Sequence, residues 1–154
     1  MTLPQDESMV NVVVPFHNTA KDLRGRIESV LAQSYGNFEL ILQDNASDDG
    51  STAIALEFAG RDPRIRYFRL ASLVPQVPNY NLPLERIRPD SAYCKIVQAD
   101  DWIHPECIRC LVAYQREGLQ TQGLRIEPLK FALGMIRVLA EDVTCPVRGS
   151  AWRE

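Results

Sequence analysis

Short apolar segments alternate with segments of helical periodicity, and this alternation limits the fold of the chain more than any other feature. The β-branched run VNVVVP, residues 10–15, predicts a strand that is buried on both faces. A helix is then predicted over residues 20–34 from apolar residues at helical spacing: Leu23, Ile27, Val30 and Leu31. Buried strands that alternate with helices form a largely parallel sheet flanked by helices. The chain is therefore expected to be an α/β domain.

The same alternation continues along the chain. It predicts further strands over residues 38–43, 65–70 and 93–98, and further helices over residues 51–59, 79–88 and 105–116, with Ser51 as the N-cap of the first of these helices. A last helix is predicted over residues 128–140. The expected organisation is an N-terminal tail (1–8), one sheet domain (9–117) and a divergent helical tail (118–154).

Composition excludes several classes of protein. A chain of 154 residues is long enough for one domain with a real core. Its net charge of −3 gives no basic surface for nucleic acid, and it lacks the run of about 18 apolar residues that a membrane helix needs. The pattern favours a cytoplasmic protein whose cysteines are mostly reduced. Cys107 and Cys110 share a predicted helix face and are expected to pack as small hydrophobic residues, because no second cysteine pair completes a zinc site.

Polar side chains follow three of the predicted strands at the point where each strand ends. They are His17 and Asn18, Asp44 and Asn45, and Asp100 and Asp101. In open parallel sheets, ligands bind outside the carboxyl ends of the strands, where the strand order reverses. The sequence therefore predicts a binding site at this edge of the sheet.

Asp100 and Asp101 are the most informative of these residues. Two adjacent carboxylates at the mouth of a buried strand repel each other and lose hydration, and such a pair usually persists because a cation or a polar ligand lies between them. Carboxylate oxygens suit Mg²⁺ or Mn²⁺, and these ions commonly hold phosphate oxygens as well. The alternative is that both residues cap the helix predicted to begin at Pro105.

Four segments in register resemble glycosyltransferase family 2, a large family of inverting, nucleotide-sugar-dependent enzymes with the GT-A fold. They are VPFHN (14–18), LAQSYGNFELILQDNASDDGS (31–51), DPRIRYFRL (62–70) and KIVQADDW (95–102). The resemblance runs from residue 9 to about residue 112. It implies transfer of a sugar from a nucleotide-sugar, with a UDP-sugar favoured, to a hydroxyl of a glycan or lipid-linked acceptor. Cell-envelope polysaccharide biosynthesis is the implied setting.

The resemblance also implies roles for single residues. His17 would stack on the nucleotide base behind the rigid turn at Pro15, and Asp44 would accept a hydrogen bond from an N–H of the base. Asn45 replaces a frequent second aspartate. Two local alternatives stay open: His17 can hydrogen-bond its neighbours, and Asn45 can form an Asx turn.

The metal site is implied in the same way. Asp101 matches the carboxylate that coordinates the divalent ion of a DxD-type motif, and Asp100 matches the ribose or metal shell. Many members of the family carry another aspartate where this chain has Gln98. Asp48 and Asp49 are interpreted as partners of a helix dipole and not as ligands.

The catalytic base is the weakest part of the resemblance, because only about fifty residues follow Asp101. Glu141 and Asp142 are weak candidates for this base and are better interpreted as a solvated surface pair. The chain could be truncated or frameshifted, a catalytically inert remnant, or a subunit whose acceptor site comes from a partner or oligomer at the inner membrane face. Cations for the phosphates are also in doubt, since neither Arg86 nor Arg88 aligns with the family's arginine, and the direction of Lys95 is unknown.

Overall fold

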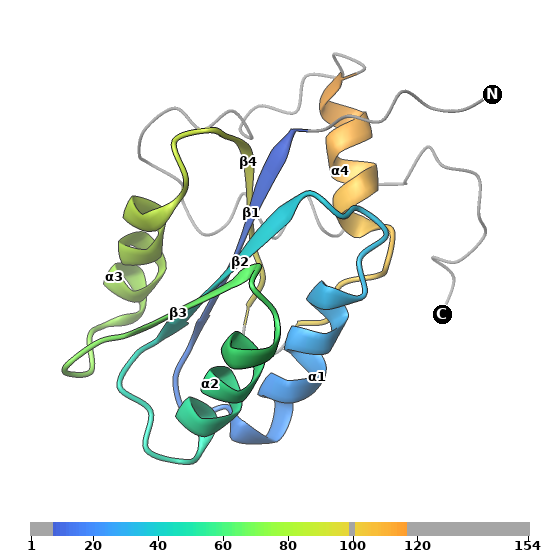
Figure 1. Cartoon of the computed structure of the whole chain (residues 1–154). Helices are drawn as coiled ribbons and strands as arrows, with labels where there is room; N and C mark the ends of the chain where they lie inside the picture. The colour runs from blue at the N-terminus through green and yellow to red at the C-terminus, as the bar shows by residue number, and fades with distance from the viewer. Residues whose placement is uncertain (1–7, 99–100, 117–154) are drawn as a thin grey trace.

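The computed structural model describes residues 8–98 and 101–116, and it contains a four-stranded sheet in the order β3-β2-β1-β4. The strands are β1 (Met9–Phe16), β2 (Phe38–Asp44), β3 (Ile65–Arg69) and β4 (Ser91–Ile96). All three strand pairings are parallel. The expected α/β architecture with a parallel sheet is confirmed (Figure 1).

Helices cover both faces of this sheet, but unequally. One face carries α1 (Ala20–Leu31), α2 (Ser51–Arg61) and α4 (Cys107–Arg116), and the other carries the short α3 (Gln76–Asn81) and a 3₁₀-helix, η1 (Leu82–Arg86) (Figure 1). Alternate residues of β1 serve the two layers: Val12 and Val14 pack toward α1, α2 and α4, whereas Val13 packs with Tyr80 of α3. A strand buried on both faces must be apolar at successive positions, which explains the run VNVVVP.

The strand order reverses between β1 and β4. From β1 the chain builds β2 and then β3 outward on one side, and it then crosses back to place β4 on the other side of β1. The register pairs Phe16 with Asp44 and Asp44 with Arg69, so these strands end level with one another. We call this side of the sheet the carboxyl edge. It is the side on which open α/β sheets bind ligands, at the reversal point.

Two predicted helices differ from those observed. The first helix ends at Leu31 and not at residue 34, because the buried side chain of Gln33 accepts a hydrogen bond from the backbone of Ile108 and donates one to that of His104. The segment predicted as one helix over residues 79–88 is α3 followed by η1. Pro83 stands within the first two residues of η1 and has no N–H for an α-helical bond, which accounts for the change of helix type.

The prediction that Ser51 caps α2 is wrong by one residue. Gly50 occupies the N-cap position with φ of 96°, and Ser51 is the first helical residue. The carboxylate of Asp49 performs the capping instead: its Oδ1 accepts hydrogen bonds from the Ser51 backbone N–H (3.0 Å) and hydroxyl (2.6 Å). A left-handed residue lets the chain turn from this carboxylate into the helix, and glycine adopts that conformation without strain.

Gly50→Ala is therefore expected to lower the free energy of unfolding by about 1 kcal/mol, because an added Cβ strains the left-handed backbone although no atom lies within 4 Å of it. Gly60→Ala is the matched control. Gly60 lies inside α2 with equally open surroundings, so alanine there should raise stability by about 0.5 kcal/mol or more. Urea unfolding of the two variants gives both values. Equal effects of the two substitutions would contradict the role of Gly50.

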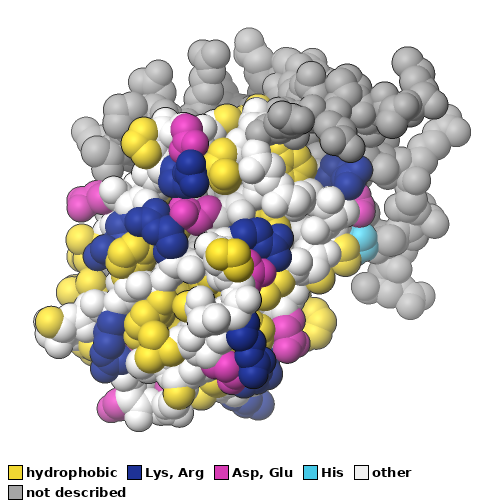
Figure 2. Space-filling view, in the orientation of Figure 1, with side chains coloured by type: hydrophobic (Ala, Val, Ile, Leu, Met, Phe, Trp, Pro, Cys, Tyr) yellow, Lys and Arg dark blue, Asp and Glu magenta, His cyan; other side chains and the backbone are white. Residues whose placement is uncertain are grey.

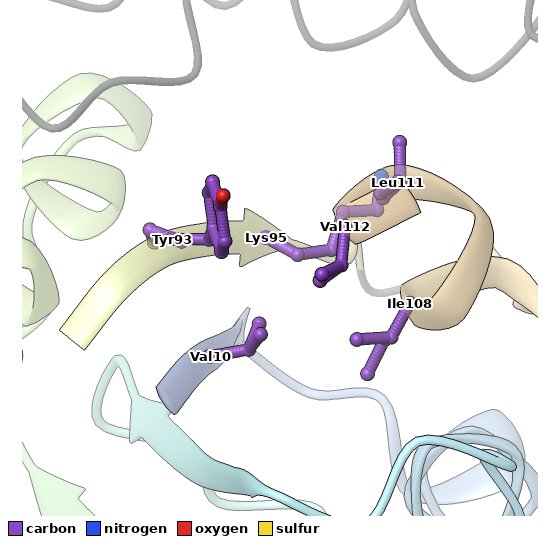
Figure 3. A pocket seen from close by; sticks show the side chains of 7 residues that line it. Val10, Tyr93, Lys95, Ile108, Leu111 and Val112 are labelled. Carbon is purple, nitrogen blue, oxygen red and sulfur yellow. The ribbon is translucent and has the colours of Figure 1, made fainter. Parts of the chain in front are cut away.

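The space between the sheet and α4 contains a small apolar cavity (Figure 3). Its lining includes Val10 of β1, Ile108 and Val112 of α4, and the half-buried Lys95 of β4. Lys95 therefore lies on the α4 side of the sheet. This position settles its direction and gives no support for a contact with phosphate at the carboxyl edge.

The cysteines within the described residues behave as core residues. Cys94 and Cys107 are free thiols, and burial raises the pKa of Cys94 to about 12 and also raises that of Cys107. Cys107 packs against the main core cluster. Cys110 is 2% exposed but is disulfide-bonded, so the expectation that it packs as a reduced thiol is wrong. Thiols held in the protonated form are poor nucleophiles and metal ligands, in agreement with the packing role predicted for Cys107. Among the helices over the described residues, none combines the length and apolarity that crossing a bilayer requires.

Candidate functional site

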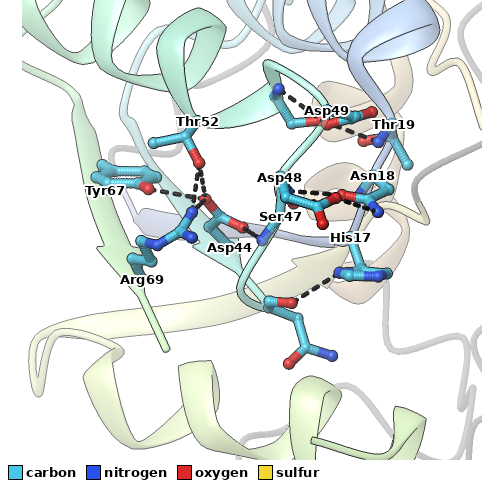
Figure 4. A network of polar contacts seen from close by, with 12 residues as sticks. His17, Asn18, Thr19, Asp44, Ser47, Asp48, Asp49, Thr52, Tyr67 and Arg69 are labelled. Carbon is cyan, nitrogen blue, oxygen red and sulfur yellow. Dashed lines mark hydrogen bonds and ion pairs between the residues drawn. The ribbon is translucent and has the colours of Figure 1, made fainter. Parts of the chain in front are cut away.

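Two loops at the carboxyl edge, residues 17–20 after β1 and residues 45–51 after β2, are joined by a set of hydrogen bonds that we call the loop clasp (Figure 4). The Asp48 backbone N–H donates to Asn18 Oδ1 (2.9 Å), and Asn18 Nδ2 donates to Asp48 Oδ1 (2.8 Å). The Asn18 backbone N–H donates to Ser47 Oγ (3.0 Å). Asn18 has φ of 50°, a conformation that asparagine tolerates better than most residues. Asn18 thus joins the two loops.

The clasp continues at the starts of α1 and α2. Asp49 Oδ2 accepts a hydrogen bond from the Ala20 backbone N–H (2.9 Å), and Ser51 Oγ accepts one from the Thr19 backbone N–H (2.9 Å). The hydrogen bond from the Ser51 side chain, followed by that from the Ala20 backbone, lowers the pKa of Asp49. One carboxylate thus serves the N-termini of two helices, as predicted for a helix-dipole partner. Asp48 bonds to Asn18 instead.

His17 follows β1 and is exposed at the carboxyl edge. Its Nδ1 lies 2.8 Å from the backbone oxygen of Asn45. His17 therefore hydrogen-bonds a residue 28 positions away that is its neighbour in space, and the exposed ring also remains accessible for a ligand. The turn predicted at Pro15 is wrong: Pro15 lies one position before the end of β1, is buried within the sheet and pairs with Gln43 of β2.

Asn45 links the same loop to the segment after β3. Its Nδ2 donates to the Val74 backbone oxygen (2.8 Å), and its Oδ1 accepts from the Val74 backbone N–H (2.9 Å). Both polar atoms of the amide are thus used by a residue 29 positions away and not by the local turn that was the alternative interpretation. Asn45 is 4% exposed and fixes the loop between β3 and α3 at the carboxyl edge.

Asp44, the last residue of β2, is at the centre of a buried polar cluster (Figure 4). Its side chain is 0% exposed. Oδ1 accepts a hydrogen bond from the Ser47 backbone N–H (2.8 Å). Oδ2 accepts three more, from Thr52 Oγ1 (2.6 Å), Tyr67 Oη (2.8 Å) and Arg69 (3.0 Å). Because the side chain is fully buried and Oδ2 already has three donors, a ligand can reach this carboxylate only if one of the present partners moves.

The cluster sets the charge of its members. Burial alone would raise the pKa of Asp44, but the hydrogen bonds from Thr52, Ser47 and Tyr67 together outweigh burial and lower it. Arg69 is half-exposed and ends β3 beside the buried carboxylate. The hydrogen bond with Tyr67, followed by the charge of Asp44, raises the pKa of Arg69. The cluster therefore holds a charged guanidinium in a fixed position at the carboxyl edge.

The segment after β4 is anchored to α1. The buried Arg26 donates from Nε to the backbone oxygen of Asp101 (3.1 Å), and the Ser34 backbone N–H donates to the Pro105 oxygen (2.8 Å). Gln33 donates to the backbone oxygen of His104 (2.8 Å). Asp101 itself is exposed. Three contacts from α1 and the residues just after it thus position the segment that carries this carboxylate.

Three of the predicted site residues, Asp100, Glu141 and Asp142, lie outside the described residues. Over residues 8–98 and 101–116, no group of three or more histidine, cysteine, aspartate or glutamate side chains is arranged to hold a metal. The exposed carboxylate of Asp101 has the right chemistry for Mg²⁺ or Mn²⁺ and belongs to the segment that follows the carboxyl end of β4. A magnesium ion that keeps several waters needs only one or two such carboxylates.

Arg86 and Arg88, the two arginines considered for phosphate contacts, both make contacts within the protein. The Arg86 guanidinium carbon lies 4.1 Å from the ring centre of Phe68, and Arg88 forms an ion pair with Asp90 (2.7 Å) just before β4 begins. Figure 2 shows basic side chains beside acidic ones on the face it presents. Arg88 stands before β4 and so at the opposite edge of the sheet, whereas the Arg86 guanidinium packs on Phe68, the residue before the end of β3.

Sequence reasoning missed Arg69, Tyr67, Thr52, Arg26 and Val74. A signal for the first two was available, because Ile65, Tyr67 and Arg69 alternate along β3 and parallel strands that end together place Arg69 beside Asp44. Arg26 lies between Leu23 and Ile27 on the apolar face of α1, a position that predicts burial.

Comparison with known proteins assigns the family. Residues 11–125 match the sequence model of Glycosyl transferase family 2. The chain belongs to this family. Glycosyltransferase GlyG of Streptococcus pneumoniae is 31% identical over 109 residues, which cover 71% of this chain and 36% of that protein. The family resemblance read from the sequence is thus confirmed.

Solved structures agree on the fold. S. aureus TarS 1–349 in complex with UDP-GlcNAc has a TM-score of 0.63 at 22% identity, over 71% of this chain and 31% of that one. Mannosyltransferase PcManGT from Pyrobaculum calidifontis, solved with GDP-Man and Mn²⁺, has a TM-score of 0.57 at 22% identity, over 63% of this chain and 29% of that one. This family 2 chain thus has the GT-A fold and spans about a third of each of these proteins.

Proposed function

We propose that this chain supplies the donor-binding part of an inverting, metal-dependent glycosyltransferase, which moves a sugar from a nucleotide-sugar to an acceptor hydroxyl. The observation that carries the proposal is the loop clasp with its neighbours: His17, Asp44 and Asn45 come together at the carboxyl edge in a chain of family 2. Two structural relatives were solved with nucleotide-sugars, TarS with UDP-GlcNAc and PcManGT with GDP-Man. Both kinds of donor are consistent with the site, and the UDP-sugar remains favoured.

Within the proposed site the residues have different tasks. His17 contacts the nucleoside from the end of β1, behind the buried Pro15. Asn45 holds the loop between β3 and α3 against the site. Asp44 acts chiefly through Arg69, because its own carboxylate is fully buried and the guanidinium beside it is half-exposed. A direct bond from Asp44 to the base remains part of the proposal only if the base displaces one of its present partners.

Asp101, together with Asp100, is proposed to hold Mg²⁺ or Mn²⁺. A divalent ion there supplies positive charge for the diphosphate that departs from the sugar. PcManGT was solved in complex with Mn²⁺, and this supports the choice of ion. The contribution of the chain is to present the Asp101 carboxylate on a segment fixed by Arg26 and Gln33.

The metal site is tested by calorimetry with UDP and with GDP, each with Mn²⁺ or with a chelator. Asp101→Asn is expected to weaken the metal-dependent binding of the preferred nucleotide at least about tenfold, because an amide is a weaker ligand than a carboxylate for a hard cation. Asp90→Asn is the matched control, since Asp90 is exposed just before β4 and so stands at the opposite edge of the sheet. Binding that is unchanged in Asp101→Asn would overturn the metal assignment.

Turnover is a separate question from binding. Release of nucleoside diphosphate from UDP-GlcNAc or GDP-Man by the purified chain would support sugar transfer and exclude a catalytically inert binding protein. Binding of the nucleotide without release would favour the second interpretation of the sequence, in which the acceptor site and catalytic base come from elsewhere. A glycan or lipid-linked acceptor at the cytoplasmic side of a membrane remains the predicted second substrate.

A further inference from the structure

We infer that His17 recognises the nucleotide as a hydrogen-bond acceptor, through Nε2, and not only as a stacking surface. The inference rests on the proposed function, because it concerns how the same site reads its ligand. The group that His17 recognises is an O–H or N–H donor of the nucleoside, either a ribose hydroxyl or an N–H of the base.

The tautomer of His17 is set by its backbone partner. Nδ1 lies 2.8 Å from the backbone oxygen of Asn45, and a carbonyl oxygen can only accept a hydrogen bond. The proton of the neutral imidazole must therefore be on Nδ1. Nε2 then carries a lone pair and is an acceptor.

The surroundings of the ring are rigid. The Asn45 backbone N–H donates to the Phe16 oxygen (2.8 Å), and the loop clasp holds Asn18, the next residue, by three hydrogen bonds. The Asn45 carbonyl that bonds to the His17 ring thus belongs to a residue held by Phe16, and the residue after His17 is held by the loop clasp. A ligand does not have to order this ring, so the free energy cost of binding is reduced.

The ring also stands where a ligand is expected. His17 is exposed immediately after β1, the strand beside which the sheet order reverses. Figure 4 shows the ring with one nitrogen directed at the Asn45 carbonyl and its other side directed away from it. Nε2 therefore faces outward at the edge where the nucleotide is proposed to bind. A neutral imidazole with this tautomer favours hydroxyl and N–H groups and disfavours phosphate oxygens, which have no proton to donate.

The tautomer can be tested without any nucleotide. Two-bond ¹H–¹⁵N correlation spectra of the full chain distinguish a protonated Nδ1 from a protonated Nε2 in a neutral imidazole. We expect the pattern of protonated Nδ1 for His17, and loss of the signal in His17→Asn assigns it. A spectrum with protonated Nε2 would overturn the inference directly.

Binding variants separate the acceptor role from stacking. His17→Phe keeps an aromatic face but has no acceptor, His17→Asn keeps a donor for the Asn45 oxygen, and His17→Gln places an amide oxygen near the position of Nε2. We expect roughly tenfold weaker nucleotide binding for the Phe and Asn variants, about the value of one hydrogen bond, and recovery of most of the affinity in the Gln variant. If His17→Phe binds as tightly as the wild type, stacking accounts for the role of His17 and the inference is wrong.

Nucleotide analogues identify the group that is read. UDP with a methyl group at N3, 2′-deoxy-UDP and 3′-deoxy-UDP each lack one donor. One analogue should bind the wild type about tenfold more weakly than UDP, and the same analogue should bind His17→Asn as that variant binds UDP. If none of the three shows this coupling, the acceptor role is overturned while nucleotide binding stands. If the wild type binds neither UDP nor GDP with or without metal, the proposed function itself fails.

Discussion

Asp44→Ala is expected to lower the free energy of unfolding by about 3 kcal/mol. The substitution removes a fully buried carboxylate and leaves the Thr52 and Tyr67 hydroxyls, the Ser47 N–H and the Arg69 guanidinium without the acceptor they share. Each buried donor without a partner costs about 1–3 kcal/mol, reduced here because Arg69 can turn toward water. Urea unfolding followed by circular dichroism measures the loss.

Two variants set the scale for this loss. Asp90→Ala removes an exposed carboxylate that pairs with Arg88, and it should change stability little because water replaces the partner. Tyr67→Phe deletes one of the four donors to Asp44 and should cost about 1 kcal/mol. If Asp44→Ala proves no more destabilising than Asp90→Ala, the buried cluster does not hold the ends of β2 and β3 together.

The same carboxylate gives a pH dependence with a definite sign. The pKa of Asp44 is lowered in the folded state from the ordinary value of 3.8, so the folded protein binds its proton less readily than the unfolded chain does. The stability from Asp44 is therefore fully present above about pH 4 and is lost as the pH falls through the lowered folded pKa. The difference in unfolding free energy between wild type and Asp44→Asn should shrink across this acid range and stay constant between about pH 5 and pH 7.

The strands and their carboxyl ends could be predicted from the sequence because each signal is local. A strand buried on both faces must be apolar throughout, and the polar residue that ends it marks the edge, as with His17 after β1 and Asp44 at the end of β2. Helix ends were less predictable. Gln33 ends α1 through contacts with residues more than 70 positions later, and no local pattern carries that information.

The partners of the predicted site residues could not be predicted for the same reason. The Asn45 side chain bonds to the backbone of Val74, and backbone atoms are the same in every residue, so the sequence gives no sign of this contact. A local pattern suggests only an Asx turn for this side chain. The strand-end position of Asp44 favours a ligand contact, whereas the three side chains that occupy it come from α2 and β3. The sequence thus predicts which residues lie at the carboxyl edge, but it does not predict which partners their side chains bond to.

Arg26 shows what such a hidden partner can do for the proposed site. It occupies a core position of α1, is 0% exposed, and donates to the backbone oxygen of Asp101 across 75 positions of sequence. A buried guanidinium is costly to desolvate, and this one reaches the segment that presents a proposed metal ligand. Its role is positioning, because it touches the backbone of Asp101 and not the exposed carboxylate.

Arg26→Met is expected to weaken metal-dependent nucleotide binding about tenfold, while it changes the free energy of unfolding by less than about 2 kcal/mol. Methionine fills much of the space with an unbranched apolar side chain, and replacement of a buried charge by such a residue is often nearly neutral for stability. The Asp101 oxygen loses its donor, so the Asp101 carboxylate is held less firmly for the metal. Titration calorimetry gives the affinity, and hydrogen exchange of residues 101–106 should become faster in the variant.

Arg24→Met is the matched control, since Arg24 lies in the same helix but is exposed and pairs with Glu57 of α2. This variant should bind nucleotide as the wild type does, with unchanged exchange in residues 101–106. Arg26→Ala should instead lose about 3 kcal/mol of stability, because it leaves a cavity as well as an unpaired carbonyl. A stable Arg26→Met protein with wild-type affinity and wild-type exchange would show that the segment after β4 is placed by Gln33 and the Ser34 backbone alone.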